Sequence, residues 1–196
     1  MADALTSAKP RTSASLAETR AAMVELIPSL RAFARSLCAN SARADDLVQE
    51  ALVKALANID HFEPGSNLRA WMFTILRNTY YSDLRKRRRE VEDPEGAYAA
   101  KLAERPNQHS VADLEDFKQA FAQLSDDHRE VLTLVGAVGL SHEEAAEICG
   151  CAIGTIKSRV NRARNKLAEL LGMSLEDASA RTGAELLPEG LIAGHS

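Results

Sequence analysis

The chain has 196 residues, a formal net charge of −4 and a sequence pI of about 5.8. This length holds one domain or two small ones, and the slightly acidic balance gives no overall sign of a nucleic-acid partner. No apolar run approaches the roughly 20 residues that span a bilayer. The first residues lack the apolar core of a signal peptide, so we expect a cytoplasmic protein.

Three cysteines, Cys38, Cys149 and Cys151, are too few and too odd in number for a disulfide scaffold. The spacing of Cys149 and Cys151 allows metal or redox chemistry, but His142 is the only histidine nearby. Small, half-buried residues are the favoured interpretation of this pair. We find no nucleophile-and-base pattern and no phosphate-binding glycine loop, so we expect no catalytic residue, no metal and no cofactor.

Residues 1–17 are expected to form a disordered arm, and residues 18–89 the first helical domain. Within this domain, residues 21–37 carry apolar side chains at helical spacing. Pro28 lies inside that run and is expected to kink the helix, because proline lacks the backbone N–H that an interior position needs.

A second helix is predicted for residues 43–59, with Asp45 and Asp46 in its first turn, where they would interact favourably with the helix dipole. With Gln49 and Glu50 they make an acidic surface that would repel phosphate and suits a protein partner. An ordinary solvated face explains the same pattern, and from these residues alone it is the preferred explanation. The side chains expected to be buried are Leu47, Ala51, Val53, Leu56 and Ile59.

A third helix is predicted for residues 68–89, with Asn67 as its N-cap. It ends in five adjacent cations, residues 85–89, which repel one another and favour a polyanion. Aromatic rings beside cations suit unstacked bases. A solvated basic helix end, or a core role for the tyrosines, are the alternatives. The residues of this mixed stretch are Arg77, Asn78, Tyr80 and Tyr81.

Residues 90–112 are predicted to be a flexible acidic linker. The stretch 90–116 contains eight acidic and two basic side chains together with Pro94, Gly96 and Pro106. Such a composition favours flexibility over a packed element. Residues 113–172 are expected to form the second helical domain, with Ser125 and Ser141 as helix caps, and residues 173–196 a C-terminal tail.

The most specific pattern lies in residues 140–171. Ser141 and Glu144 have the spacing of a capping box, and Gly150 suits a tight turn between two helices. The second helix has no acidic residue between Cys151 and Ala168. These features predict a helix-turn-helix that enters a DNA groove. The alternative, a solvated basic helix, is disfavoured because the capped first helix, the glycine turn and the basic second helix all indicate the same motif. Its apolar stripe is Ile153, Ile156, Val160, Ala163, Leu167 and Leu170.

The predicted fold class is all-α: two small helical domains joined by a flexible acidic linker. Three segments in this order carry a family resemblance: ADDLVQEALVKAL, NLRAWMFTILRNTYYSDLRKRRR and LSHEEAAEICGCAIGTIKSRVNRARNKL. Together they resemble the bacterial extracytoplasmic-function (ECF) sigma factors of RNA polymerase. The resemblance spans residues 26–171 and implies sigma region 2 in the first domain and sigma region 4 in the second.

The resemblance also implies a role for particular residues. Docking on the largest subunit of core RNA polymerase falls to Asp46, Gln49 and Glu50. Binding and melting of the promoter −10 element fall to Asn67, Arg77, Asn78, Tyr81, Arg85, Lys86 and Arg88. Recognition of the −35 element in the major groove falls to Thr155, Lys157, Ser158, Arg159, Asn161 and Arg162.

More narrowly, the chain is similar to the general-stress sigma factors of the EcfG type. Those are held by a small anti-sigma protein, NepR-like, which a PhyR-like response regulator titrates. The resemblance therefore implies core RNA polymerase, promoter DNA and an anti-sigma factor as partners. Two other functions stay open: a helix-turn-helix regulator that binds duplex DNA alone, and a sigma-like decoy that only titrates an anti-sigma factor.

Overall fold

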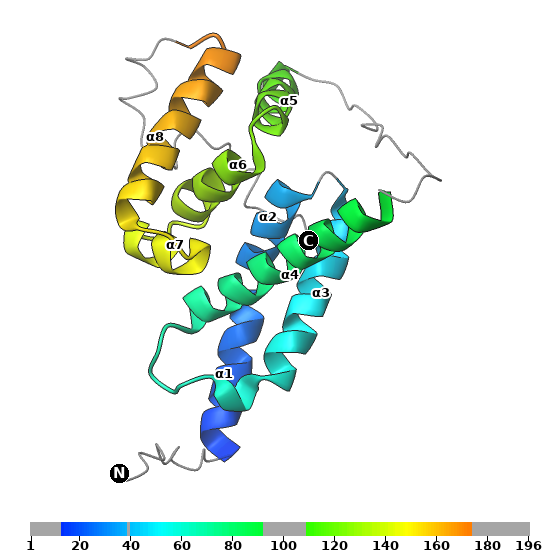
Figure 1. Cartoon of the computed structure of the whole chain (residues 1–196), viewed down its shortest axis with the longest axis vertical. Helices are drawn as coiled ribbons and strands as arrows, with labels where there is room; N and C mark the ends of the chain where they lie inside the picture. The colour runs from blue at the N-terminus through cyan, green and yellow to red at the C-terminus, as the bar shows by residue number, and fades with distance from the viewer. Residues whose placement is uncertain (1–12, 39, 92–108, 174–196) are drawn as a thin grey trace.

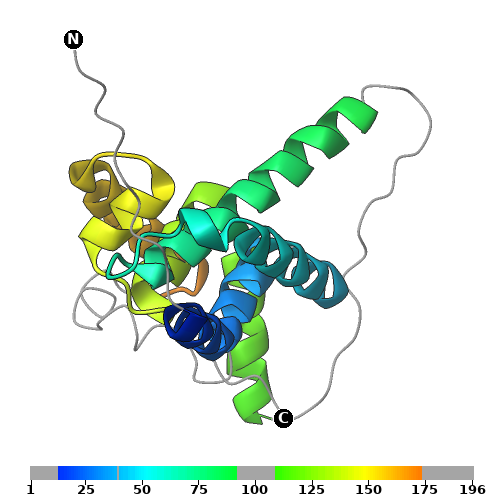
Figure 2. The same cartoon turned by 90° about the horizontal axis from the view of Figure 1, so that it is seen from below.

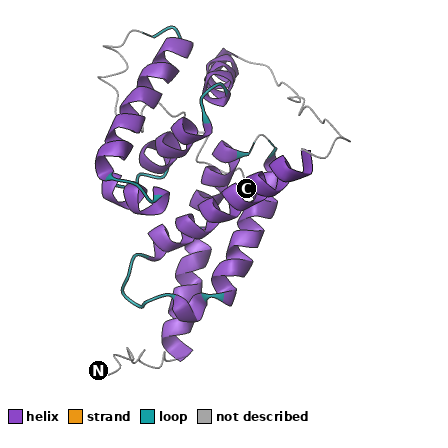
Figure 3. Ribbon diagram, viewed as in Figure 1, coloured by secondary structure: helices purple, strands orange, loops and turns teal. Residues whose placement is uncertain are grey.

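The computed structural model describes residues 13–38, 40–91 and 109–173, and in this part of the chain it contains eight α-helices and no strand. The all-α prediction is confirmed for these residues (Figures 1 and 3). Most of the predicted N-terminal arm, the middle of the acidic linker and the C-terminal tail lie outside the described residues. The helices extend further than expected, since residues 13–17, 90–91 and 109–112 are helical.

The first four helices make one bundle. α1 (Ser13–Glu25) leads into α2 (Ile27–Leu37), α3 (Ser41–Ala57) packs beside α2, and α4 (Leu68–Val91) crosses both. A short 3₁₀ turn, Ile59–His61, follows α3.

The core of this bundle is built on α2, α3 and α4. The rings of Phe33 and Phe73 lie 5.4 Å apart, and Leu30, Met72 and Leu76 are completely buried around them. Burying side chains of this size is worth about 1.5–3 kcal/mol each, so this cluster is the main source of the domain's stability.

The ends of these helices follow the local sequence. Pro28 lies in the first turn of α2, where a missing N–H costs least, so the expected kink is a break between α1 and α2. Asn67 caps α4 as predicted, since its Oδ1 accepts from the backbone N–H of Ala70 at 3.0 Å. Asn40 caps α3 in the same way. Asp45 and Asp46 are therefore not in the first turn of α3, contrary to expectation.

In the helix predicted for residues 43–59, two of the side chains expected to be buried lie on the surface. Val53 is 66% exposed and Leu56 is 48% exposed, whereas Leu47, Ala51 and Ile59 are buried as predicted. The prediction was wrong because helical spacing identifies an apolar stripe without saying how wide a stripe the neighbouring helices cover.

The second domain contains α5 (His109–Ala122), α6 (Asp126–Leu132), α7 (His142–Cys149) and α8 (Ile153–Leu170). A π-helical segment, Thr133–Ala137, continues α6. Ile156, Val160, Ala163 and Leu167 on α8 are buried, as the predicted stripe requires, while Ile153 and Leu170 pack at its edge.

The local signals of the helix-turn-helix are confirmed. The Ser141 hydroxyl accepts from the backbone N–H of Glu144, and the Glu144 carboxylate accepts from the backbone N–H of Ser141. Gly150 has φ 65° and ψ 39°, the left-handed conformation that ends α7. Ser125 caps α6 as expected.

The two domains pack against each other. α4 lies along α7, and α2 lies against α6 and the π-helical segment (Figure 1). We call this packing the closed arrangement. Its existence is not evident from the sequence, which indicates two domains and a linker only.

We predict that Gly150→Ala lowers the free energy of unfolding by about 1–2 kcal/mol, because an L side chain is strained in the left-handed region. A Cβ at this position meets no atom within 4 Å, so the backbone is the only source of the loss. Gly154→Ala is the matched control. It also has open space, lies at the start of α8 and should stabilise by up to about 1 kcal/mol. Urea unfolding measures both, and equal effects would contradict the prediction.

Candidate nucleic-acid interface

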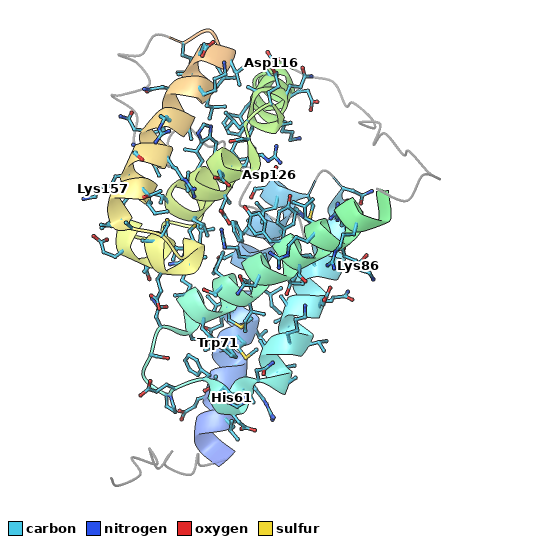
Figure 4. All side chains as sticks on the ribbon, viewed as in Figure 1. His61, Trp71, Lys86, Asp116, Asp126 and Lys157 are labelled. Carbon is cyan, nitrogen blue, oxygen red and sulfur yellow. The ribbon has the colours of Figure 1, made fainter. Side chains whose placement is uncertain are left out.

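The outward face of α8 is polar and basic. Because Ile156, Val160 and Ala163 turn inward, Lys157, Ser158, Asn161 and Arg162 are exposed on the other side, and Thr155 is half-buried. Figure 4 shows Lys157 pointing away from the domain. Arg162 is held along the helix, since its guanidinium donates to the Ser158 hydroxyl at 3.2 Å and to the Ser158 carbonyl at 3.3 Å.

Arg159 lies differently from the other predicted residues of α8. Its guanidinium pairs with Asp127 of α6 at 3.1 Å, and 29% of its side chain is exposed. A half-exposed pair of this kind contributes only about 0–1 kcal/mol. Arg159 can therefore leave Asp127 for a stronger anion at little cost.

The far end of α4 carries a group of cations and projects beyond the bundle (Figure 2). Arg85, Lys86, Arg87 and Arg89 are exposed there, and Lys86 is labelled in Figure 4. Arg88 is part of α4, but its side chain is outside the described structure. Because these side chains share one free helix end, they form a compact positive surface.

One carboxylate within the bundle engages two of the nearby cations. Asp83 accepts from Arg43 at 2.9 Å and from Arg87 at 3.3 Å. Partial burial alone would raise the pKa of Asp83, but these two guanidinium groups hold it below its usual value. Arg87 is therefore partly neutralised within the domain.

Arg77 and Tyr81 do not face solvent as a DNA-binding surface would. The Arg77 guanidinium donates to Glu130 of α6 at 2.7 Å, and the Tyr81 hydroxyl lies 3.4 Å from the same carboxylate. Arg77 also lies over the Tyr81 ring, 4.7 Å from its centre. Asn78 is exposed, and Tyr80 belongs to the core.

Glu130 is a functional candidate that sequence reasoning missed. Its side chain is completely buried, which is rare for a carboxylate without a partner. Burial raises the pKa of the Glu130 carboxyl, and the Arg77 guanidinium opposes that rise. Burial and then the Glu130 carboxylate raise the pKa of Tyr81, so its hydroxyl keeps its proton as a donor. The one available signal was an acidic residue next to four apolar residues within 131–135.

The start of α4 also touches the second domain. The Asn67 amide donates to Glu144 at 2.8 Å, and the Arg69 guanidinium donates to the backbone carbonyl of Val138. Asn67 thus caps its own helix and contacts the capping box of α7. The closed arrangement occupies α4 from its first turn to Tyr81.

The exposed face of α3 combines acidic and apolar side chains. Asp46, Gln49 and Glu50 are exposed as predicted, and Glu50 pairs with Lys54 at 2.7 Å. Val53 follows Asp46 by seven positions and Gln49 by four, so it continues the same face. We call the exposed side chains Asp46, Gln49, Glu50, Val53 and Leu56 the α3 face.

The cysteines are free thiols. Cys149 is buried, and burial, followed by the Glu130 carboxylate, raises its pKa to about 12, so it stays protonated. Among the described residues, no group of three or more His, Cys, Asp or Glu side chains could hold a metal ion. Within the same residues, no helix is long and apolar enough to cross a membrane.

Comparisons with known proteins match both domains. The profile of the Sigma-70 region 2 family matches residues 23–90, and that of the Sigma-70 region 4 family matches residues 114–167. The ECF RNA polymerase sigma factor EcfG of Rhodopseudomonas palustris is 64% identical over 145 residues, 74% of this chain and 80% of that protein. The chain belongs to the ECF sigma factors.

Two solved structures resemble this sigma factor. The sigma factor RpoE of Bartonella quintana, in complex with the anti-sigma factor NepR, has a TM-score of 0.71 and 55% identity over 79% of this chain and 97% of that one. CnrH, in complex with the cytosolic domain of CnrY, has a TM-score of 0.56 and 28% identity over 81% of this chain and 96% of that one. The region 2 match covers the last residues of α1 and all of α2 and α3 with most of α4, and the region 4 match runs from within α5 to within α8.

Proposed function

We propose that this sigma factor joins core RNA polymerase, without catalysing any bond change, and directs it to promoters that carry particular −35 and −10 elements. The outer face of α8 from Ile153 to Lys166, which carries no acidic side chain, is the observation that carries the proposal. Its exposed hydrogen-bond donors point outward because the apolar stripe on the opposite side of α8 is buried in the domain. This role places the protein in the cytoplasm, where the polymerase works.

Region 4 reads the −35 element with α8 in the major groove. A groove about 12 Å wide admits one helix, and base edges there offer a distinct pattern of donors and acceptors. The reading residues are Thr155, Lys157, Ser158, Arg159, Asn161 and Arg162. Arg162 suits a bidentate contact with guanine, because its guanidinium is exposed and already oriented by Ser158.

Region 2 binds the −10 element as it melts. The cations Arg85, Lys86 and Arg88 attract phosphates without regard to sequence. Asn67, Arg77, Asn78 and Tyr81 supply hydrogen bonds and one aromatic face for an unstacked base. All of these residues lie on α4 or just before it, so one helix carries both the phosphate-binding and the base-binding groups.

The polymerase docks on the α3 face. Asp46 and Glu50 are negative and would repel DNA, and with the neutral Gln49 they suit a basic protein surface. Val53 and Leu56 add exposed apolar area to the same face, and apolar anchors surrounded by charges are the usual composition of an interface centre.

An anti-sigma factor holds this chain inactive, and the regulon is a stress response. Support comes from the relatives: RpoE of Bartonella quintana is bound to NepR, and CnrH to a domain of CnrY. The 64% identity to EcfG favours a small NepR-like protein. Titration of that protein by a PhyR-like response regulator follows from the resemblance to the EcfG type.

Transcription with purified core polymerase tests the proposed function. In the absence of an anti-sigma factor, we expect starts at one position on a promoter with both elements. Arg162→Ala should reduce initiation by the equivalent of about 1–3 kcal/mol, because a bidentate base contact is lost. On a template with a substituted −35 element, the difference between wild type and variant should shrink.

Lys118→Ala is the control for that experiment. Lys118 is an exposed cation on α5, away from α8's outer face, and its removal should leave initiation unchanged. Absence of a specific start with the wild-type chain would contradict the function. Tight duplex binding without polymerase would instead support an ordinary regulator.

The cations at the end of α4 should bind DNA phosphates through charge alone, without regard to sequence. Replacing Arg85, Lys86 and Arg89 by Gln is expected to weaken holoenzyme binding equally on all promoters. The slope of log affinity against log salt should fall by up to about 2, at roughly 0.7 for each single-strand phosphate lost. A loss confined to particular −10 sequences would contradict this prediction.

A triple replacement elsewhere is the control for the salt experiment. Arg20, Arg35 and Lys118 are also exposed cations, on α1, α2 and α5. Changing these three to Gln removes the same net charge and should leave the salt slope unchanged.

A further inference from the structure

The contact between the two domains contains a buried ion pair. Arg77 and Glu130 are 53 positions apart in sequence, yet Nε and Oε1 lie 2.7 Å apart. The Glu130 side chain has no exposed surface, and that of Arg77 is 20% exposed. A charge-assisted hydrogen bond of this length is about twice as strong as a neutral one. Because its two members lie on α4 and α6, in different domains, the pair exists only in the closed arrangement.

The same carboxylate lies against a second group proposed to bind DNA. The Tyr81 hydroxyl is 3.4 Å from Glu130 Oε2, and the Tyr81 ring lies under the Arg77 guanidinium. The Glu130 carboxylate therefore contacts Arg77 and Tyr81 in the way that an anionic ligand accepting hydrogen bonds would. A nucleic-acid strand carries such groups as phosphates and base oxygens.

Other contacts of the closed arrangement cover the start of the same helix. Asn67 donates to Glu144, and Arg69 donates to the backbone carbonyl of Val138. Each acceptor belongs to the second domain. Asn67, Arg69, Arg77 and Tyr81 therefore cannot bind both a DNA strand and the second domain at once.

The pair is stable only while both members are present. Removing one member of a buried pair leaves the other charge desolvated, which strongly disfavours the buried state. Burial also raises the pKa of Glu130, which means that the ionised carboxylate is less stable at this site than it is in water. Such a contact can be exchanged for a better anion, unlike an apolar interface of the same size.

We propose that Glu130 is an internal competitor of the −10 strand. In the closed arrangement its carboxylate occupies Arg77 and Tyr81, and the strand binds these residues only after the second domain leaves α4. The inference rests on the proposed function of α4. It adds an autoinhibitory contact within the chain, present without any inhibitor protein.

Strand binding by the free, full-length chain tests the competition. The probe is a fluorescent single-stranded oligonucleotide with the −10 sequence, without polymerase. Glu130→Gln keeps the side chain's shape but removes the charge that holds Arg77. We expect it to bind the probe about tenfold more tightly than wild type, equivalent to about 1.4 kcal/mol. The gain should disappear when Arg77→Ala is also present, because Arg77 is the residue that Glu130 releases.

Glu115→Gln is the matched control. It makes the same change of charge in the second domain, at a half-exposed position on α5 paired with Lys118. We expect its affinity for the probe to equal that of wild type. An equal gain in both variants, or none in Glu130→Gln, would overturn the proposal.

A second experiment covers the case in which Glu130→Gln fails to fold. Asn67→Cys and Glu144→Cys, in a Cys151→Ser background, are joined by a short cleavable crosslinker that holds the domains closed. Probe binding should fall at least tenfold on crosslinking and return on cleavage. Unchanged binding of the crosslinked chain would overturn the proposal.

The test of Glu130 as a competitor can fail without the proposed function failing. Promoter-specific transcription together with unchanged probe affinity in Glu130→Gln would overturn the competitor and leave the function standing. Absence of specific transcription would overturn the function, whatever the probe affinity.

Discussion

A guanidinium on α4 and a carboxylate on α6 meet where the two domains touch. The Arg77–Glu130 pair fixes how α4 lies relative to the second domain, since each charge is costly to bury alone. α4 therefore has two packed sides. One, with Met72, Phe73 and Leu76, belongs to the core of region 2, and the other faces region 4. Only its basic end projects freely.

Charge is distributed so that a chain with net charge −4 still offers positive surfaces. Acidic residues form ion pairs with particular arginines within the fold: Asp83 with Arg87, Asp127 with Arg159 and Glu130 with Arg77. These pairs differ in burial, and so in how readily the arginine is released. Arg159 exchanges its partner at the surface, whereas Arg77 is released only when the domains separate.

The α3 face includes exposed apolar residues that suit binding to another protein. Val53 and Leu56 are exposed in the isolated chain, although their spacing is that of core residues. Their exposure is consistent with a helix whose stripe is completed by another protein, which the proposed docking on polymerase supplies. Region 2 would thus bind protein through α3 and DNA through α4, on separate helices.

Features that depend on neighbouring residues were predictable from the sequence. The caps at Asn67 and Ser125, the capping box at Ser141 and the turn at Gly150 each involve a few adjacent positions. The buried stripe of α8 was also predictable, because one helix period defines it. The family resemblance implies roles for particular residues, and those roles stay predictions.

Features that depend on distant residues were not predictable. Burial of Glu130 requires Arg77 from the other domain, and nothing in the local run around either residue signals the pairing. The exposure of Val53 depends on which helices cover α3. The orientation of Arg77 and Tyr81 toward region 4 is a property of the domain packing, which the sequence leaves open.

Region 4 packs on α4 in the free chain and, by our proposal, leaves it at the promoter. The distance between spin labels on the two domains measures this release. Suitable sites are Ser66→Cys and Glu143→Cys, both exposed and each next to a member of the Asn67–Glu144 contact, in a Cys151→Ser background. A single short distance in the free chain, replaced by a longer one in the promoter complex with polymerase, is the predicted result. The same distance in both states would show that region 4 stays on α4 at the promoter and would contradict the proposed release.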